Sequence, residues 1–456
     1  MITQRDLVQR LSRTSLGAWT IVERVQDIAI ADEHRSVQRR DHRTRFTLIV
    51  HQDVPRGRGS ARLDIDAHDG SADDLIERAT ALALAAVGPA WSSAPPAAPA
   101  KVTVVDDDLL KRELDAVALG TLTRLRRPPN LAVTATTELL REKLTVFASS
   151  GFHTTWPATT LRATALLATS STPTPTASPA NTSPANAPST SPSASTHRTL
   201  TISREARRTD DLDLDAAITD AASDLLHIAT AARPTPGRCA LWLGPEALLH
   251  GDASRDGHDH GLWTIFAQQA DSALERQGLT RYRWRSEISP GASQLPEPLS
   301  IRSHGAVDFA TRSTPVSDDA VAIRNFPLIA RGIAVGLGLS PREAALRHID
   351  PNGGVRNLII DPGSWSPAPS PGIRTIEVRR LHSLSIDPYT GDATLDIALA
   401  FDHHPGRSSP TPFTGGTLHL DLVTTLSRAH RSAQLLRRGA YHGPLAVLIN
   451  DADLLA

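Results

Sequence analysis

The sequence predicts an α+β fold, because helical and strand-like segments alternate in the first half of the chain and strands dominate the second half. At 456 residues the chain is long enough for two or three domains, each with its own core. Hydrophobic residues make up 40% of the chain and the formal net charge is -1. The overall composition therefore favours neither nucleic acid nor a membrane as a partner.

The first segment, residues 1–91, is predicted to be a compact α+β unit. A helix is expected near residues 4–12, and a second helix begins at Asp73, where acidic side chains favour the positive end of the helix dipole. Strands are expected around residues 19–30, 36–52 and 60–65. Residues 92–100 are rich in proline and alanine and indicate a boundary.

A low-complexity stretch interrupts the second segment, residues 101–235. Residues 170–196 contain only Ser, Thr, Pro, Ala and Asn, a composition that offers nothing to bury, so we expect them to be disordered. Their flanks, residues 159–168 and 198–204, alternate in the way of half-buried strands. An insertion that joins two paired strands fits these flanks at least as well as an interdomain linker, because loop-closure entropy rises slowly with length.

The rest of the second segment combines helices and strands. Asp106 can cap a helix that extends to residue 126, and a further helix is expected at residues 212–232. Strand-like stretches include residues 131–136 and 144–149. The predicted unit is α+β, like the first segment.

The third segment, residues 236–456, is predicted to be strand-rich. Helices are expected at residues 262–277 and 420–437, and strands at residues 394–401 and 444–449. In the first of these strands, alternate apolar residues should share one face: Leu395, Ile397, Leu399 and Phe401.

The chain shows no apolar run typical of a signal peptide or a transmembrane helix, so we expect a cytoplasmic location. Its single cysteine, Cys239, excludes an intrachain disulfide and a cysteine-rich zinc module. Because Cys239 lies in a strand-like run, we expect it to be a small buried apolar residue.

Residues 247–260, with the sequence ALLHGDASRDGHDH, contain three histidines, His250, His258 and His260. A hydrolytic zinc site needs about three protein ligands on rigid structure, an open position for water and a nearby carboxylate. Glycines and aspartates surround the last two histidines, which indicates a flexible polar loop that would bind metal weakly. The three histidines are therefore weak metal candidates, and a solvated loop is the favoured interpretation.

A glycine-containing loop occupies residues 351–363, with the sequence PNGGVRNLIIDPG. Gly353 and Gly354 permit backbone conformations that other residues avoid, and Asn357 leads into a strand. Such a loop can present amides to the backbone of a peptide, or it can be a tight structural corner. The candidate residues for either role are Asn352, Gly353, Gly354, Arg356 and Asn357.

Several short motifs give the chain a resemblance to the TldD/PmbA (TldD/TldE) family of peptidase-related proteins. They are the turn at residues 56–63 and the stretches DFATRSTP at 308–315, FPLIARGI at 326–333, RNLIIDPG at 356–363 and IDPYTGD at 386–392. The resemblance implies an N-terminal α/β sandwich-like domain and a large, strand-rich C-terminal domain, antiparallel and barrel-like. It also implies half of a heterodimer that cleaves peptides.

The catalytic members of the family, TldD, have a His-Glu-x-x-x-His helix and a late cysteine that together supply metal ligands and a general base. When His250 is placed at the first histidine, the glutamate position holds Gly251 and the second histidine position holds Arg255. A glycine cannot accept a proton, and an arginine would repel zinc. Residues 438–444 contain no cysteine.

The chain therefore resembles the TldE/PmbA side of the family, which lacks the metal motif. The resemblance implies a subunit with no catalytic residue, metal or cofactor of its own, whose TldD-like partner carries zinc, and a peptide as the substrate of the pair. Two alternatives stay open: an active metallopeptidase with a rearranged site from His250, His258 and His260, and a peptide-binding scaffold without peptidase activity.

Overall fold

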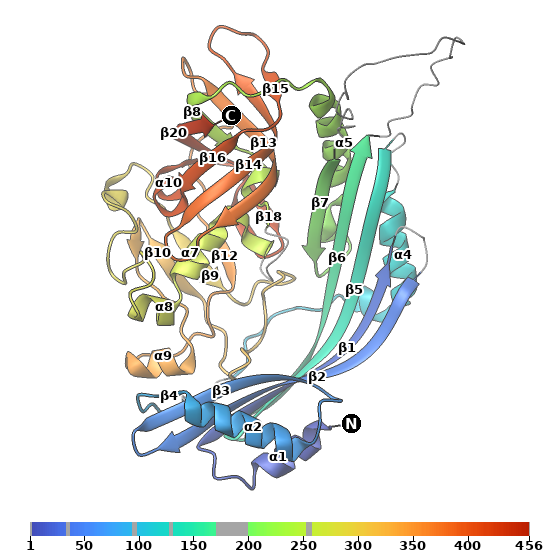
Figure 1. Cartoon of the computed structure of the whole chain (residues 1–456), viewed down its shortest axis with the longest axis vertical. Coiled ribbons are helices and arrows are strands. Elements are labelled where there is room, and N and C mark those ends of the chain that lie inside the picture. Colours follow the sequence, from blue (N-terminus) through green and yellow to red (C-terminus); the bar gives the residue numbers. More distant parts are fainter. Residues whose placement is uncertain are drawn as a thin grey trace, which may run out of the picture.

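The computed structural model describes residues 2–32, 37–93, 98–126, 131–169, 199–251 and 258–455. A long, curved, antiparallel sheet of seven strands runs along one side of the molecule in the order β4-β3-β2-β1-β5-β6-β7 (Figure 1). Residues 237–455, called the C-terminal unit below, form a strand-rich body beside it. The α+β class predicted from the sequence is confirmed.

The lower end of the long sheet packs against two helices. Thr3 and Asp6 form a capping box that starts α1, and Ser71 caps α2. Leu7 of α1 and Ala79 of α2 are fully buried with Phe46 and Leu48 of the sheet. The elements are α1 (Gln4–Leu11), β1 (Ala18–Ala31), β2 (Val37–Val54), β3 (Gly57–Asp66), α2 (Ala72–Ala85) and β4 (Val87–Gly88). The predicted helices and strands of this segment are all present.

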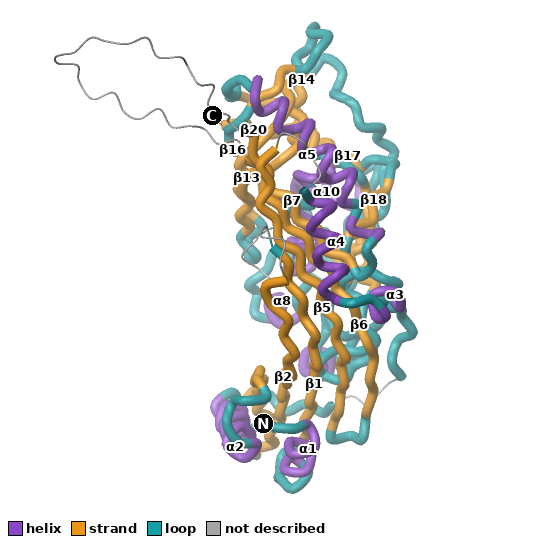
Figure 2. Tube along the Cα trace, turned by 90° about the vertical axis from the view of Figure 1, so that its right-hand side faces the viewer, coloured by secondary structure: helices purple, strands orange, loops and turns teal. Residues whose placement is uncertain are grey.

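The upper end of the sheet carries α4 and α5, which pack on it through a second apolar cluster (Figure 2). The elements are α3 (Asp107–Lys111), α4 (Leu114–Leu125), β5 (Leu131–Ala148), β6 (His153–Thr169), β7 (Thr199–Ala206), η1 (Asp210–Leu212) and α5 (Leu214–Thr230). The helix predicted at residues 106–126 is two helices, because the backbone is extended at Arg112. The two strands predicted between residues 131 and 149 are one strand, β5.

The predicted pairing across the low-complexity stretch is confirmed. β6 and β7 are antiparallel neighbours, with Ala168 opposite Thr199. The expectation of disorder at residues 170–196 lies outside the described residues.

Strands from the first two predicted segments share one sheet. β1 pairs with β2 on one side and with β5 on the other, where Thr20 lies opposite Ala148. The sheet is therefore continuous across the boundary expected at residues 92–100, and the division into domains stays a prediction.

A closed barrel of five strands forms one part of the C-terminal unit, with the neighbour order β13-β8-β20-β16-β14 and a closing β13–β14 pair. Its strands are β8 (Gly237–Leu243), β13 (Thr375–Ile386), β14 (Asp392–His403), β16 (Thr417–Asp421) and β20 (Val447–Leu455). The short strands β15 (Thr411–Phe413) and β17 (His430–Arg431) attach to β14 and β20. The barrel-like expectation is confirmed.

A sheet of six strands forms the other part, in the order β11-β10-β9-β12-β19-β18. Its strands are β9 (Ile301–His304), β10 (Phe326–Ala330), β11 (Ile333–Ala334), β12 (Asn357–Ile360), β18 (Leu435–Arg438) and β19 (Tyr441–Pro444). The helices of the C-terminal unit are α6 (Pro245–Leu248), η2 (His258–Trp263), α7 (Thr264–Gln269), α8 (Ser272–Arg276), η3 (Ala292–Gln294), α9 (Pro341–Leu346) and α10 (Leu422–Arg428).

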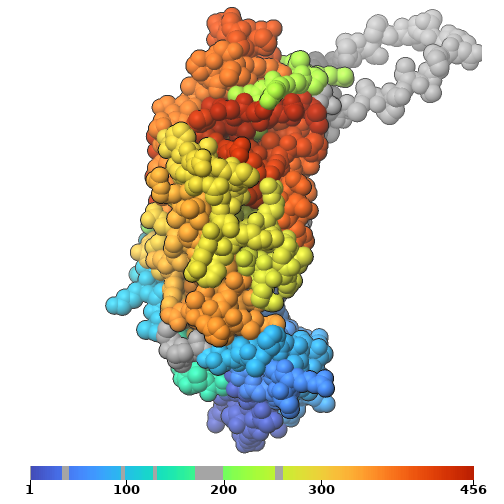
Figure 3. Space-filling view, turned by 90° about the vertical axis from the view of Figure 1, so that its left-hand side faces the viewer, coloured from blue at the N-terminus to red at the C-terminus, as the bar shows by residue number. Residues whose placement is uncertain are grey.

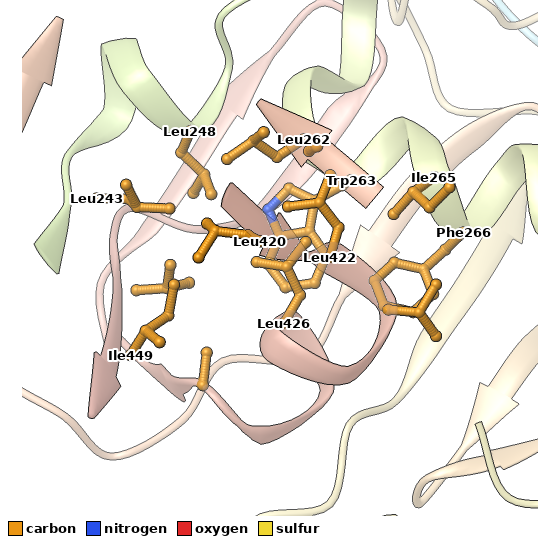
Figure 4. Close-up of a cluster of buried hydrophobic side chains, with 14 of the residues drawn as sticks. Leu243, Leu248, Leu262, Trp263, Ile265, Phe266, Leu420, Leu422, Leu426 and Ile449 are labelled. Carbon is orange, nitrogen blue, oxygen red and sulfur yellow. The ribbon is translucent and has the colours of Figure 1, made fainter. Parts of the chain in front are cut away.

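The core of the C-terminal unit gathers around Trp263 and Phe266, between α7, α10 and the barrel (Figure 4). Cys239 is buried in the same cluster, as predicted, and burial raises the pKa of its thiol to about 11. Among the described residues, no helix is long and apolar enough to span a bilayer.

Two predicted helices are shorter than expected. The helix expected at residues 262–277 breaks after Gln269, and Asp271 caps α8 by accepting hydrogen bonds from two backbone amides. The helix expected at residues 420–437 ends at Arg428, because the following residues form β17 and β18. Arg431 is buried there and donates to the carbonyl groups of Asp361 and Glu297, a tertiary contact that overrides helix propensity.

The apolar face expected along residues 394–401 divides between two cores. Leu395 and Ile397 pack inside the C-terminal unit, whereas Leu399 joins the cluster under α5 and Phe401 packs against that cluster. Irregular register between β13 and β14 in this region redirects the side chains.

The C-terminal unit also rests on the lower end of the long sheet, where α9 lies above β4 (Figure 3). A Cβ atom added at Gly88 of β4 would lie 2.5 Å from Nη2 of Arg342 in α9. Contacts near both ends of the long sheet therefore fix the position of the C-terminal unit relative to the sheet.

Because Ala168 and Thr199 are paired, a short loop can connect β6 to β7. We predict that replacing residues 170–198 with a short loop containing Asn-Gly leaves the thermal unfolding midpoint within about 3 °C of the parent, as measured by circular dichroism. A variant that keeps half of the stretch is the control. Loss of cooperative unfolding in the short-loop variant would contradict the hairpin.

Candidate functional site

A cleft of about 1250 Å³ lies between the long sheet and the C-terminal unit. One wall comes from β6 and β7, and the other from the end of α6, residues 311–318, β13 and the end of β18. Its volume is above the range of about 300–1,000 Å³ that is usual for small-molecule sites. We take this cleft as the candidate functional site.

Arginines dominate the charged lining of the cleft. Eight arginines line it, against four carboxylates. The arginines are Arg24, Arg162, Arg204, Arg207, Arg312, Arg356, Arg380 and Arg438, and the carboxylates are Glu142, Glu205, Glu246 and Asp318. Two cleft histidines, His250 and His382, add polar groups.

Glu246 is the centre of a buried ion network at the cleft. Its Oε1 lies 2.7 Å from Nη2 of Arg204 and 2.9 Å from Nη1 of Arg438, and its Oε2 lies 3.1 Å from Nη1 of Arg380. Burial alone would raise the pKa of this carboxyl, but Arg438, Arg204 and Arg380 lower it to about 2. Glu246 is therefore charged at neutral pH.

The local sequence explains the position of Glu246. Gly244 ends the run of β8, and Pro245 starts α6 with the fixed backbone angle that suits a first helical position. Glu246 follows directly, in the first turn of the helix, where a negative charge is favoured.

Asp224 of α5 extends the network behind the cleft. Its Oδ2 lies 2.7 Å from Nε of Arg380, and its Oδ1 lies 3.3 Å from Nη2 of Arg379. Arg380 thus bridges two carboxylates, that of Asp224 on α5 and that of Glu246 on α6. Burial lowers the pKa of Arg204 in spite of the opposing effect of Glu246, as expected for a cation that is only 5% exposed.

Residues 311–318, which carry most of the DFATRSTP motif, are attached to the long sheet at two points. Arg207, at the end of β7, donates to the carbonyl groups of Ala310, Thr311 and Ser313 at 2.7–3.1 Å. Asp318 accepts from Arg24 of β1 at 2.7 Å and from Arg62 of β3 at 2.9 Å. Burial raises the pKa of Asp318, and the two arginines outweigh it and lower the pKa overall.

The hydrogen bonds of the predicted loop at residues 352–357 are those of a structural corner. Gly353 and Gly354 have φ of 78° and 84°. The Asn352 side chain accepts from the amides of Leu339 and Gly354 and donates to the carbonyl of Leu337. These bonds fix the backbone that leads into β12.

The other two residues of the predicted set differ in position. Asn357 donates to the carbonyl of His304 at 2.7 Å and to Oγ of Ser313 at 2.8 Å, so it ties the motif segment to β12. Arg356 donates to the carbonyl of Gly353 and is the one member of the predicted set that lines the cleft. A contact of this loop with a peptide stays a prediction.

The three candidate histidines have different surroundings. His250 lines the cleft beside Gly251, whereas the side chain of His258 and the whole of Arg255 lie outside the described residues. His260 is fully buried, which corrects the expectation of a solvated loop. Gly261 explains the burial, because its positive φ of 54° and its packing against the backbone of Leu248 and Leu249 turn the segment inward.

The described residues do not fit a zinc site. Within them, no group of three His, Cys, Asp or Glu side chains is placed to hold a metal ion. Neither ring nitrogen of His260 forms a hydrogen bond of ordinary geometry with the described residues, although the backbone of Arg356 and Ala440 lies close. Burial, with a smaller effect of Arg312, lowers the pKa of His260 to about 3, so its ring is neutral.

The sequence does not predict the ion network. Arg204, Glu246, Arg380 and Arg438 are far apart in the chain, and each looks like an ordinary surface charge. One signal was present: Arg204 occupies a position of the buried alternation in β7, where an apolar residue is usual. A charge at such a position requires a partner.

No model of a protein family matches the sequence, and no curated protein matches it. Solved structures do match along the whole length. A proposed modulator of DNA gyrase from Bacteroides thetaiotaomicron is 12% identical with a TM-score of 0.73, covering 100% of both chains. A second proposed modulator of DNA gyrase, from Thermotoga maritima, is 12% identical with a TM-score of 0.72, covering 99% of this chain and 100% of the other.

TldE from Thermococcus kodakarensis is 14% identical with a TM-score of 0.71, and the match covers 100% of both chains. The chain therefore has the fold of TldE and of these two proteins from end to end. This confirms the fold that the resemblance to the TldD/PmbA family implied.

Removal of the charge at Glu246 should destabilise the protein. In Glu246→Gln, three arginines would face each other without the carboxylate that offsets them, and we expect a loss of about 3 kcal/mol in the free energy of unfolding, measured in urea at neutral pH. Asp451→Asn, which breaks an exposed ion pair with Arg238, is the matched control and should cause no measurable loss.

The difference between wild type and Glu246→Gln should also depend on pH. The pKa of Glu246 falls from an ordinary value of 4.5 to about 2 in the folded state. The charge therefore contributes fully above pH 4.5, and its contribution is lost as the pH falls toward 2. A difference that is constant over this range would contradict the network.

Proposed function

We propose that this chain is a non-catalytic, TldE/PmbA-like subunit of a heteromeric metallopeptidase that degrades or processes peptides in the cytoplasm. Its partner would be a TldD-like subunit that carries zinc. One observation carries the proposal: Gly251 lies on the wall of the cleft, at the position where the resemblance places the catalytic glutamate. A glycine has no group that can take a proton from water.

The fold supports the same proposal. The match to TldE extends over the whole chain, so the long sheet and the C-terminal unit are both present. A subunit with this architecture can contribute a wall and a binding surface to a shared chamber, while the partner supplies the metal.

The cleft is suited to hold an extended chain. β7 is the last strand of the long sheet and pairs only with β6 among the described strands. Six of its residues line the cleft, so its free edge offers backbone donors and acceptors to a peptide. The contribution of this subunit would be to position a peptide and to exclude water.

The geometry disfavours a rearranged site built from the three histidines. A catalytic zinc ion must be open to water. His250 lines the cleft, but His260 is fully buried. A peptide-binding scaffold uses the same cleft, so activity of the assembled pair is what separates it from the proposed subunit.

The test is co-expression with a TldD-like partner, followed by a peptidase assay of each subunit and of the purified pair. We expect no activity from this chain alone and chelator-sensitive activity from the pair. His250→Ala in this chain should retain at least about half of that activity, whereas loss of the partner's glutamate should abolish it.

Two outcomes would overturn the proposal. Chelator-sensitive cleavage by this chain alone, with near-stoichiometric zinc that is lost in a His258→Ala, His260→Ala variant, would establish the rearranged metallopeptidase. A stable pair without peptidase activity would establish the scaffold.

A further inference from the structure

Positive charge is concentrated in the cleft. The whole chain has a formal net charge of -1, yet the cleft lining has eight arginines and four carboxylates, an excess of four positive charges. Charged groups that contact the lining reduce this excess: Arg62 adds one cation, and Glu138, Asp224, Asp319 and Asp396 add four carboxylates. An excess of one positive charge remains. A cleft with walls of low polarisability focuses such a field on its ligand.

The arginines of the cleft divide into a buried and an accessible set. The side chains of Arg204 and Arg380 are 5% and 6% exposed, and both are held by Glu246. They contribute to the field without meeting a ligand directly. Two carboxylates, Glu246 and Asp224, face the three guanidinium groups of Arg204, Arg380 and Arg438, which leaves one positive charge.

Arg438 and Arg162 are the accessible donors. The side chain of Arg438 is 20% exposed, and its Nη1 contacts Glu246. Its other guanidinium nitrogens form no hydrogen bond with the described residues and can bind a ligand carboxylate. Arg162, on the opposite wall in β6, is half exposed and lies 2.8 Å from Glu205.

The shape of the cleft favours a peptide over a nucleic acid. Apolar side chains also line the cleft and can receive peptide side chains: Leu144, Trp156, Leu166 and Leu249. The free edge of β7 runs along the same wall and suits an extended backbone. A duplex-binding protein would instead present a basic outer face on a basic chain, and this chain is close to neutral.

We infer that the cleft selects peptides rich in aspartate and glutamate, whose carboxylates are bound by Arg438 and Arg162 from opposite walls. Guanidinium groups bind carboxylates with paired, charge-assisted hydrogen bonds, which gives both affinity and direction. The inference rests on the proposed function for the peptide nature of the ligand. It deepens that function by naming the substrate class.

The test measures binding to this chain alone, so it does not depend on a partner or on peptidase activity. Two dye-labelled peptides of about ten residues are compared by fluorescence anisotropy: one with alternating glutamate and apolar residues, and one with glutamine at each glutamate position. We expect the acidic peptide to bind at least about tenfold more tightly at low salt, and this difference to shrink at high salt.

Variants locate the interaction. Arg438→Gln and Arg162→Gln should each weaken the acidic peptide at least about threefold and leave the neutral peptide unchanged. Arg238→Gln removes the same charge from the exposed start of β8, away from the cleft, and should have no effect. Because Arg162 is half exposed, its replacement should not unfold the protein, and thermal unfolding of each variant checks this.

Three results would overturn the inference: equal affinity for the two peptides, equal effects of Arg438→Gln and Arg238→Gln, or tighter binding of a DNA duplex than of the acidic peptide. Failure of the proposed function is a separate result. An inactive pair that still prefers the acidic peptide would retain this inference, and an active pair without that preference would retain the proposed function alone.

Discussion

The arrangement of the two halves of this protein depends on one carboxylate, that of Glu246. Arg204 from the long sheet, Arg380 from the barrel and Arg438 from the six-stranded sheet all contact it. The guanidinium groups of Arg204 and Arg380 are buried and that of Arg438 is partly buried. At this spacing they repel each other, and a charged partner of good geometry offsets both the repulsion and the loss of water. The network therefore fixes how the sheet, the barrel and α6 meet, and with them the walls of the cleft.

The other contacts between the halves act around this centre. Arg207 and Asp318 attach residues 310–318 to the long sheet, and α9 rests on β4. The result is a cleft that is held open by fixed walls, lined by arginines, and bordered by a strand edge. At the position where the resemblance to TldD places a base, this chain has Gly251. Under the proposed function, this geometry serves binding, and a partner supplies catalysis.

The sequence predicted the local structure well and the site poorly, and physics explains both. Alternating apolar residues predicted β6 and β7 and their pairing, since a strand must bury one face. The ion network could not be predicted, because Arg204 and Arg438 meet only after the chain has folded. His260 looked polar and solvated from its aspartate and glycine neighbours, yet Gly261 turns it into the interior. The long helix expected near residue 430 fails because Arg431 finds buried carbonyl partners that no local pattern reveals.

We propose that this protein binds its ligand in the cleft between the long sheet and the C-terminal unit. Hydrogen–deuterium exchange of the chain with and without a bound acidic peptide tests it most directly. We predict slower exchange in β7 and in residues 311–318 and 438–439, with no change in α1 and α2. Protection confined to α1, α2 or the outer face of the barrel, with β7 unchanged, would contradict it.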